Sequence, residues 1–380
     1  MRRHNLAATE VAATGLLVVA LFLPPPLSAE EFCPPKCPSG TMTLGFAGPL
    51  TGASAAFGLQ TSKSVQVGVD KLNAVGGVLG VPVKLSSGDD RCDRGQSVDV
   101  ANRHVLNEKL TFVIGPACPA AALTASQIYA KAGVVQFAPT ATTVDLTRQG
   151  LDSVFRMLAT VEQEAQELGR YFAREYPGKK LTVVYVDNFY GRSIANNIRQ
   201  AVPPKSLGQF EPLLHMPGAY DRLVDKLQRN PPDAIYIALQ DGTSVEFLQA
   251  LSQRNLKPVI LGGQQLLSQS FWFQARELAE GIRVLAPISS VTDPGFKAAV
   301  DQLNAAKIIP DLVALSSLAA VQTWAEAVRR AGSGDPKAVI QVLHAGEFHT
   351  AIGPVAFDER GDRRDIRYTV LTWRNERLSP

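Results

Sequence analysis

The feature that most constrains this chain is a type of strand end that recurs four times. The apolar run 42–47 ends in Gly48-Pro49 and continues through Thr51-Gly52 into a helical segment. Later apolar runs also finish in small, hydroxyl or polar residues, at 113–118, 135–142 and 183–188. In an open parallel α/β sheet, ligands bind outside the carboxyl ends of the strands, where backbone N–H groups, hydroxyls and helix N-termini converge. The repeated ends therefore predict a binding site for a small molecule.

Short apolar runs alternate along the chain with segments of helical periodicity. Val65, Val69 and Leu72, for example, share one helical face. Alternation of this kind predicts βαβ units with parallel sheets, and we expect a change of unit near residues 156–162. The other expected elements are strand 81–85, helix 98–110, helix 161–176, strand 181–186, helices 193–200 and 221–228, strand 234–239, helix 244–253, strands 259–261 and 282–286, and helices 294–303 and 314–331.

Composition bounds the size of the core and the class of partner. A chain of 380 residues that is 46% hydrophobic can bury one large core or two ordinary ones. The net charge is +3 and only 19% of the residues are charged, so the sequence contains no basic stripe. We therefore expect no binding to nucleic acid or to a membrane surface.

The N-terminus has the pattern of an export signal. Arg2-Arg3 precedes an apolar run at 11–23, and small residues end the segment at Ser28-Ala29. This order predicts a secretory signal peptide over residues 1–29, followed by a Cys/Pro-rich leader at 30–40. A membrane anchor is the alternative, but the apolar run is shorter than the roughly 20 residues that a span requires. Cys33 lacks the preceding small-residue box of a lipoprotein, so we expect a soluble exported protein.

The sequence contains no pattern typical of a catalytic or cofactor site. Its five histidines show no metal-ligand spacing, and no serine lies in a nucleophile elbow. Gly76-Gly77 and Gly80 lack the Lys-Ser/Thr pair of a phosphate loop, so turn glycines are the better interpretation. Asp89-Asp90 and Asp93 could form a metal cluster, but a solvated loop is the simpler interpretation. We predict a protein that is not an enzyme and has no cofactor.

Several blocks resemble one family. They are GPLTGASAAFG, GGVLGVPVKL, GDDRCD, FVIGPAC, APTATTVDLT, VDNFYGRS and GPVAFDERGDRRDIRY. In this order, from about residue 41 to the C-terminus, they resemble the periplasmic leucine/isoleucine/valine-binding proteins of ABC transporters. The resemblance implies a type I periplasmic binding protein fold, in which two Rossmann-like α/β lobes with parallel sheets are joined by three crossover strands. It further implies a monomer in the periplasm that delivers a small solute to permease and ATPase subunits.

Composition does not show where the chain crosses between the lobes. The lobe boundaries are therefore taken from the resemblance. It assigns residues 41–159 and 288–351 to the first lobe. Residues 160–287 and 352–380 are assigned to the second lobe. Each lobe is expected to contribute contacts to a solute bound between them.

The resemblance assigns ligand contacts to particular residues. In the segment Thr140-Ala141-Thr142 it implies that Thr142 holds the ligand carboxylate and that the carbonyl of Thr140 faces the ligand amine. A capped turn before the next helix is the alternative and is compatible with that role. Phe57 matches an aromatic position against the ligand side chain, and Tyr190 matches an aromatic position in the second lobe. A buried aromatic residue is more often core, but both follow strand ends.

The chain departs from the family at three expected contacts. After Cys118 it has Pro119-Ala120 where the amino-acid binders have a serine, and proline offers neither a hydroxyl nor an N–H. Gln264 stands at the position of the glutamate that binds the ligand ammonium. A tyrosine-rich strand end is replaced by a segment that includes Gln240 and Asp241, and Asp241 is either the missing negative charge or a turn residue. The ligand is therefore left open between a branched-chain amino acid, an aromatic or aliphatic acid, an amide and another small polar solute. A ligand-sensing subunit of a regulator is a further alternative.

The cysteines are expected to be oxidised. Cys92 and Cys118 follow neighbouring strand ends, so their thiols should lie at one edge of a sheet, and the family has a disulfide at the matching positions. Cys33 and Cys37 either form a small local loop or, less plausibly, bind a metal.

Overall fold

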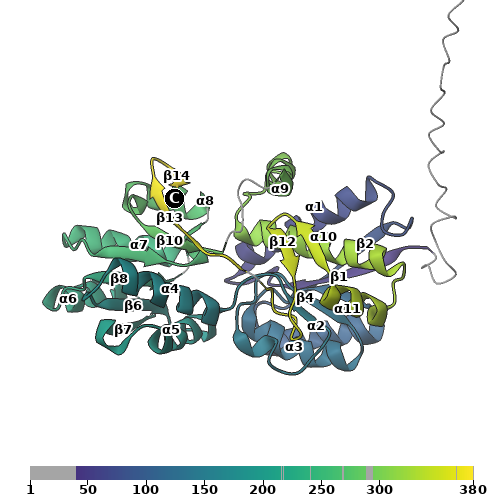
Figure 1. Ribbon diagram of the computed structural model, residues 1–380, viewed down its shortest axis with the longest axis horizontal. Coiled ribbons are helices and arrows are strands. Elements are labelled where there is room, and N and C mark those ends of the chain that lie inside the picture. Colours follow the sequence, from purple (N-terminus) through teal and green to yellow (C-terminus); the bar gives the residue numbers. More distant parts are fainter. Residues whose placement is uncertain are drawn as a thin grey trace, which may run out of the picture.

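The computed structural model describes residues 40–214, 216, 218–239, 241–267, 269–287, 294–364 and 366–379. Within these residues the chain forms two large sheets and a two-stranded ribbon. Figure 1 shows the two sheets as separate bodies, each covered by helices, lying side by side along the long axis of the molecule. The predicted signal peptide and the pair Cys33 and Cys37 lie outside the described residues.

The first sheet is parallel and has the strand order β2-β1-β3-β4-β5. Its strands are β1 (Met42–Gly48), β2 (Val83–Asp89), β3 (Phe112–Ile114), β4 (Val135–Ala138) and β5 (Val154–Arg156). The connecting helices are α1 (Ala55–Asn73), α2 (Arg94–Asn102) and α3 (Pro119–Lys131). This order is that of a doubly wound sheet, in which ligands bind beyond the carboxyl ends of the strands. The helices of this body thus begin at the edge where the site was predicted.

The second sheet has the order β14-β13-β10-β9-β8-β6-β7. Its parallel strands are β6 (Leu181–Val186), β7 (Leu207–Leu213), β8 (Ala234–Ala238), β9 (Val259–Gly262) and β10 (Arg283–Ala286). The antiparallel hairpin β13 (Thr369–Arg374) and β14 (Arg377–Ser379) extends it beyond β10. Its helices are α4 (Val161–Glu175), α5 (Phe189–Ala201), α6 (Ala219–Arg229), α7 (Asp241–Gln253) and α8 (Gln269–Ala275).

The sequence did not predict strand β7. Its sequence, LGQFEPL, contains a glycine and a proline and has no clear alternation of apolar and polar residues. Proline is tolerated on an edge strand because one of its sides has no ladder partner. Among the described strands β7 is at the edge of the second sheet and pairs with β6 alone. Tertiary pairing, rather than local pattern, makes this segment a strand.

The chain passes between the two bodies after β5, after β10 and after the ribbon. The ribbon consists of β11 (Glu347–Thr350) and β12 (Gly353–Ala356), which pair antiparallel. It follows α9 (Pro294–Ala305), α10 (Leu312–Ala331) and α11 (Pro336–Ala345), which lie with the first body (Figure 1). The boundary predicted at residue 352 would separate the two strands of this ribbon. We propose that the first lobe instead extends to about residue 364, where the last passage begins.

Late segments of the chain complete both cores. In the first body α10 packs along α1, and a Cβ on Gly68 would lie only 2.9 Å from a methyl group of Val321. Trp324 of α10 is fully buried, with its ring 6.0 Å from that of Phe112. In the second body Trp373 of β13 stacks on Trp272 at 5.3 Å. Each body therefore depends on residues near the C-terminal end.

Cys92 and Cys118 are bonded, as predicted, and their Cα atoms are 5.3 Å apart. Cys118 is the N-cap residue of α3. The bond therefore ties the loop after β2 to the start of that helix.

We expect the double variant Cys92→Ala/Cys118→Ala to lower the free energy of unfolding by about 3 kcal/mol, because the bond closes a loop of 26 residues in the unfolded chain. Urea denaturation under non-reducing conditions measures this loss. The variant Cys33→Ala/Cys37→Ala is the control for cysteine removal in general. A midpoint for the Cys92/Cys118 variant equal to that of the wild type would contradict the prediction.

Candidate functional site

The predicted segment Thr140-Ala141-Thr142 follows β4 and is fixed by hydrogen bonds to neighbouring segments. The Thr140 hydroxyl donates to the carbonyl of Ala117 at 2.7 Å. The backbone N–H of Val161, the first residue of α4, donates to the carbonyl of Thr142 at 3.0 Å. All three residues of the segment are buried. The segment is thus fixed to both the neighbouring strand end and the first passage to the second body.

A buried arginine, Arg156, hydrogen-bonds to this segment. The Arg156 guanidinium is fully buried and donates to the carbonyl of Ala141 at 2.6 Å and to the hydroxyl of Thr147 at 2.9 Å. Its Nε pairs with Asp362 at 2.7 Å. Burial lowers the pKa of Arg156, and the charge of Asp362 opposes that change. Asp362 lies in the loop 358–364, just before the last passage between the bodies, so one ion pair joins this loop to the predicted ligand loop.

Phe57 lies in the first turn of α1 and is half-buried. Its neighbour Gly58 has no room for a side chain, since a Cβ there would lie 1.8 Å from the carbonyl oxygen of Pro49. This close approach brings the start of α1 against the end of β1. Cys118 is buried at the N-cap of α3, and Ala120 is half-buried in the first turn of that helix. These three predicted positions therefore lie at the carboxyl edge of the first sheet.

Tyr190 lies at the corresponding edge of the second sheet. The side chain of Asn188 caps α5 by accepting the N–H of Gly191 at 2.9 Å, and a Cβ on Gly191 would lie 1.8 Å from the carbonyl oxygen of Val186. The start of α5 is thereby fixed against the end of β6. Arg94, the first residue of α2, lies over the ring of Phe189 at 5.5 Å. Because α2 belongs to the first body, this contact brings the start of α2, at the carboxyl edge of the first sheet, against the start of α5, at the carboxyl edge of the second.

Two of the predicted positions cannot be compared with the structure in full. Gln240 lies outside the described residues, and of Asp241 only the backbone is described, as the first residue of α7. The role of Asp241 as a replacement charge stays a prediction. Gln264 opens a 3-10 turn after β9, and its side-chain oxygen is buried with no hydrogen-bond partner among the described residues.

Sequence reasoning missed a buried carboxylate near these positions. Glu164, in the first turn of α4, is 3% exposed and accepts a hydrogen bond from the hydroxyl of Tyr236 on β8. Burial raises the pKa of Glu164 to about 7, and the bond from Tyr236 opposes the rise. The signal was present in the sequence, because Glu164 lies on the same helical face as the apolar residues Val161, Ala165 and Leu168.

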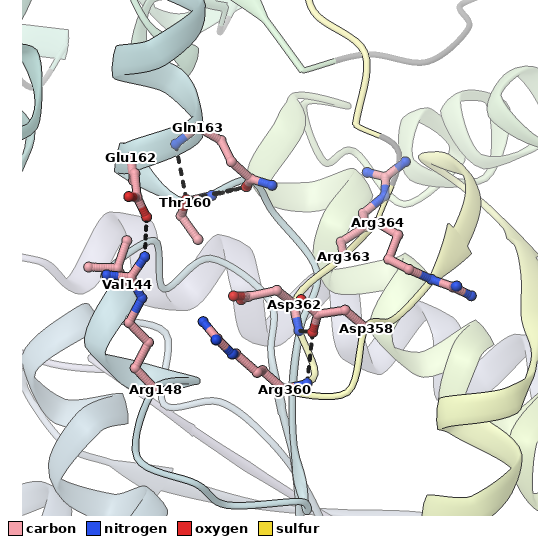
Figure 2. A pocket seen from close by; sticks show the side chains of 10 residues that line it. All are labelled: Val144, Arg148, Thr160, Glu162, Gln163, Asp358, Arg360, Asp362, Arg363 and Arg364. Atoms are coloured by element: carbon pink, nitrogen blue, oxygen red, sulfur yellow. Dashed lines mark hydrogen bonds and ion pairs between the residues drawn. The ribbon is translucent and has the colours of Figure 1, made fainter. Parts of the chain in front are cut away.

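A polar pocket of about 290 Å³ lies where two of the passages run together. Figure 2 shows Arg148 and the start of α4 with Thr160 on one side of the pocket and the loop 358–364 on the other. Arg148 and Glu162 pair on one side of the pocket, and on the other side Asp358 accepts the backbone N–H groups of Arg360 and Asp362, both at 2.9 Å. None of the residues predicted to bind ligand lines this pocket. Its lining residues instead form ion pairs and hydrogen bonds with one another.

Other classes of site find no support in the described residues. No group of three or more His, Cys, Asp or Glu side chains is placed to hold a metal ion there. Within the same residues no helix combines the length and apolar character needed to cross a membrane.

Comparison with known proteins identifies the family. A family model described as periplasmic binding protein matches residues 41–377. The chain is 28% identical over 339 residues to the leucine-, isoleucine-, valine-, threonine- and alanine-binding protein of Pseudomonas aeruginosa, covering 88% of this chain and 91% of that one. It is 30% identical to the Leu/Ile/Val-binding protein BraC3 of Rhizobium johnstonii, covering 87% of this chain and 91% of the other.

Solved structures agree on the fold. The branched-chain amino acid transporter substrate-binding protein LivJ of Streptococcus pneumoniae, in complex with isoleucine, matches with a TM-score of 0.80 at 23% identity, covering 90% of this chain and 98% of that one. A solute-binding protein from R. palustris in complex with benzoate matches with a TM-score of 0.81 at 18% identity, covering 90% and 95%. The predicted type I fold is therefore confirmed. These relatives are binding proteins rather than enzymes, as was predicted for this chain. The chain belongs to the periplasmic binding protein family, with the leucine/isoleucine/valine-binding proteins among its relatives.

Proposed function

We propose that this protein is the solute-binding component of an ABC importer and that it captures a branched-chain or other small apolar amino acid by closure of its two lobes. The observation that carries the proposal is the contact between Arg94 and Phe189, because it sets the carboxyl edge of one sheet against that of the other. A solute between the edges touches both lobes and so favours the closed state over the open one. The names of both curated relatives include leucine, isoleucine and valine, and that of the first adds threonine and alanine, which supports the choice of an amino acid as ligand.

The partners and location follow from the same proposal. The closed, loaded protein delivers its solute to permease and ATPase subunits in the membrane. We propose that residues 1–29 are removed as a signal peptide and that the mature protein acts as a monomer in the periplasm. Ligand contacts are proposed for Phe57, Thr140 and Thr142 on the first lobe and for Tyr190 and Gln264 on the second.

The test is a thermal-shift and calorimetric screen of purified mature protein. The panel is leucine, isoleucine, valine, threonine and alanine, with benzoate and 4-hydroxybenzoate as acids without an ammonium group. A ligand at 100 times its dissociation constant adds about 2.7 kcal/mol to the stability of the folded state, which a shift in melting temperature reports. Binding of amino acids supports the proposal, whereas binding of the aromatic acids alone would contradict the proposed ligand class.

Truncating the side chains of Thr142 and Tyr190 should weaken ligand binding without unfolding the protein. Thr142→Ala removes a hydroxyl from the first lobe and Tyr190→Ala removes an aromatic ring from the second, so each should raise the dissociation constant about ten-fold or more. Titration calorimetry measures the affinity, and circular dichroism confirms that each variant is folded. If neither change alters the affinity, the proposed site is wrong.

A further inference from the structure

Glu164 is a buried carboxylate for which the described residues supply no cation. Its one hydrogen bond to a side chain comes from the neutral hydroxyl of Tyr236. The basic residue nearest to it in sequence that forms an ion pair, Arg170, is bound to Glu167 at 2.7 Å. A carboxylate that is buried without a positive partner costs several kcal/mol if it is ionised, so natural proteins seldom place one in a core without a further role.

Polar groups with unmet hydrogen-bonding capacity surround this carboxylate. The hydroxyls of Tyr190 and Tyr368 and the side-chain oxygen of Gln264 are buried with no hydrogen-bond partner among the described residues. Burial raises the pKa of both tyrosines, and the nearby charge of Glu164 raises it further. The elements α4, α5 and the approach to β13 thus bring polar groups to one place, and Gln264 is next in the chain to Gly263, which adjoins the carboxylate. Two of these groups belong to residues that the sequence assigned to the ligand site.

Gly263 leaves the space that Glu164 occupies. A Cβ at position 263 would lie 1.7 Å from a carboxylate oxygen of Glu164 and 2.6 Å from the hydroxyl of Tyr236. The carboxylate therefore lies directly against the backbone next to Gln264. This is the position at which the sequence lacks the expected acidic residue.

The start of α4 connects Glu164 to the first lobe. The backbone N–H of Val161, the first residue of α4, donates to the carbonyl of Thr142, the proposed carboxylate contact. Glu164 lies three residues further along the same helix, in its first turn. The turn of α4 that carries Glu164 is therefore fixed directly beside the proposed ligand loop.

We propose that Glu164 is the residue that receives the ammonium of the bound amino acid, replacing the carboxylate that is absent at Gln264. Its neighbours Tyr190 and Gln264 offer oxygen atoms that accept the remaining ammonium hydrogens. This assignment rests on the proposed function and names the group that makes the site selective for zwitterions over simple acids.

The experiment compares two ligands that differ only in the ammonium group, L-leucine and 4-methylpentanoate. Each is titrated calorimetrically into the wild type, Glu164→Gln and Glu175→Gln. Glutamine keeps an acceptor for Tyr236 and removes only the charge. Glu175, an exposed acid at the far end of the same helix, is the matched control. We expect Glu164→Gln to weaken leucine binding about ten-fold or more, as for a lost charge-assisted bond. The same change should alter 4-methylpentanoate binding little. The melting temperature of this variant should be no lower than that of the wild type. Glu175→Gln should bind leucine like the wild type.

Each other outcome overturns the assignment. Unchanged leucine affinity in Glu164→Gln, or an equal loss for both ligands, would show that Glu164 has a structural role only. A ten-fold loss of leucine affinity in Asp241→Asn with none in Glu164→Gln would transfer the role to Asp241. If Glu164→Gln does not fold, Glu164→Asp, which retains the charge on a shorter side chain, must show the selective loss for leucine. If the wild type binds none of the amino acids, the proposed ligand class is wrong and this assignment fails with it.

Discussion

Asp362→Ala is expected to lower the free energy of unfolding by about 3 to 5 kcal/mol, because it leaves the fully buried guanidinium of Arg156 without its counter-ion. The substitution also removes a hydrogen bond to Thr147. Asp362 also accepts the hydroxyl of Thr147 at 2.8 Å, and that hydroxyl is itself a partner of Arg156. Asp362→Asn, which keeps an acceptor but no charge, should show a smaller loss. Urea denaturation followed by circular dichroism measures both variants.

The control is an ion pair at the surface. Asp301 pairs with Lys297 one turn earlier on α9, with both side chains more than 60% exposed. Asp301→Ala should cost less than about 1 kcal/mol, as exposed pairs do. Equal losses for Asp362→Ala and Asp301→Ala would contradict the importance given to Arg156. A further consequence is expected for binding, since Arg156 holds the carbonyl of Ala141 in the proposed ligand loop.

Glu164 should make the ligand-free protein less stable as pH rises. Its pKa is raised from 4.5 to about 7 in the folded state, so between these values the folded protein keeps a proton that the unfolded chain has lost. Stability falls with pH wherever the folded state binds more protons, so the loss accumulates between pH 4.5 and 7 and is complete above pH 7. A rise of this size corresponds to about 3 kcal/mol.

The variant Glu164→Gln isolates this effect. Other buried groups also titrate: the pKa of Asp90 is raised to about 6, and that of His104 is lowered to about 4. Both are present in the wild type and the variant, so the difference between the two unfolding free energies cancels them. We expect Glu164→Gln to gain stability relative to the wild type as pH rises from 5 to 8. A difference that is constant across this range would mean that Glu164 is already ionised at pH 5.

The sequence predicted the arrangement of local elements because each carries its own periodicity. The strand predicted at 181–186 matches β6, and the helix predicted at 314–331 forms most of α10. The disulfide was also predictable, since the parallel strands of one sheet bring their carboxyl ends to one edge, although β1 lies between the two strands that precede the cysteines. The resemblance further supplied the two-lobe fold, which composition alone did not show.

Partners distant in sequence could not be predicted. Arg156 and Asp362 are separated by 206 positions, and each resembles an ordinary surface residue in its own segment. Glu164 was hidden differently: its neighbours Glu162, Gln163 and Gln166 are polar, and only its position on the apolar face of the helix marks it as buried. The space beside Gly263 is a property of three packed elements and has no sequence signal of its own.

The burial of Trp324 and Trp373 has a consequence for biosynthesis. Trp324 is needed for the core of the first body, and Trp373, whose indole N–H donates to the carbonyl of Leu266 at 2.9 Å, is needed for that of the second. The chain is made from its N-terminus, so β1 to β5 are synthesised long before Trp324 and β6 to β10 long before Trp373. Each body can therefore reach its final packing only after the late segment that completes its core, α10 or β13, has been synthesised.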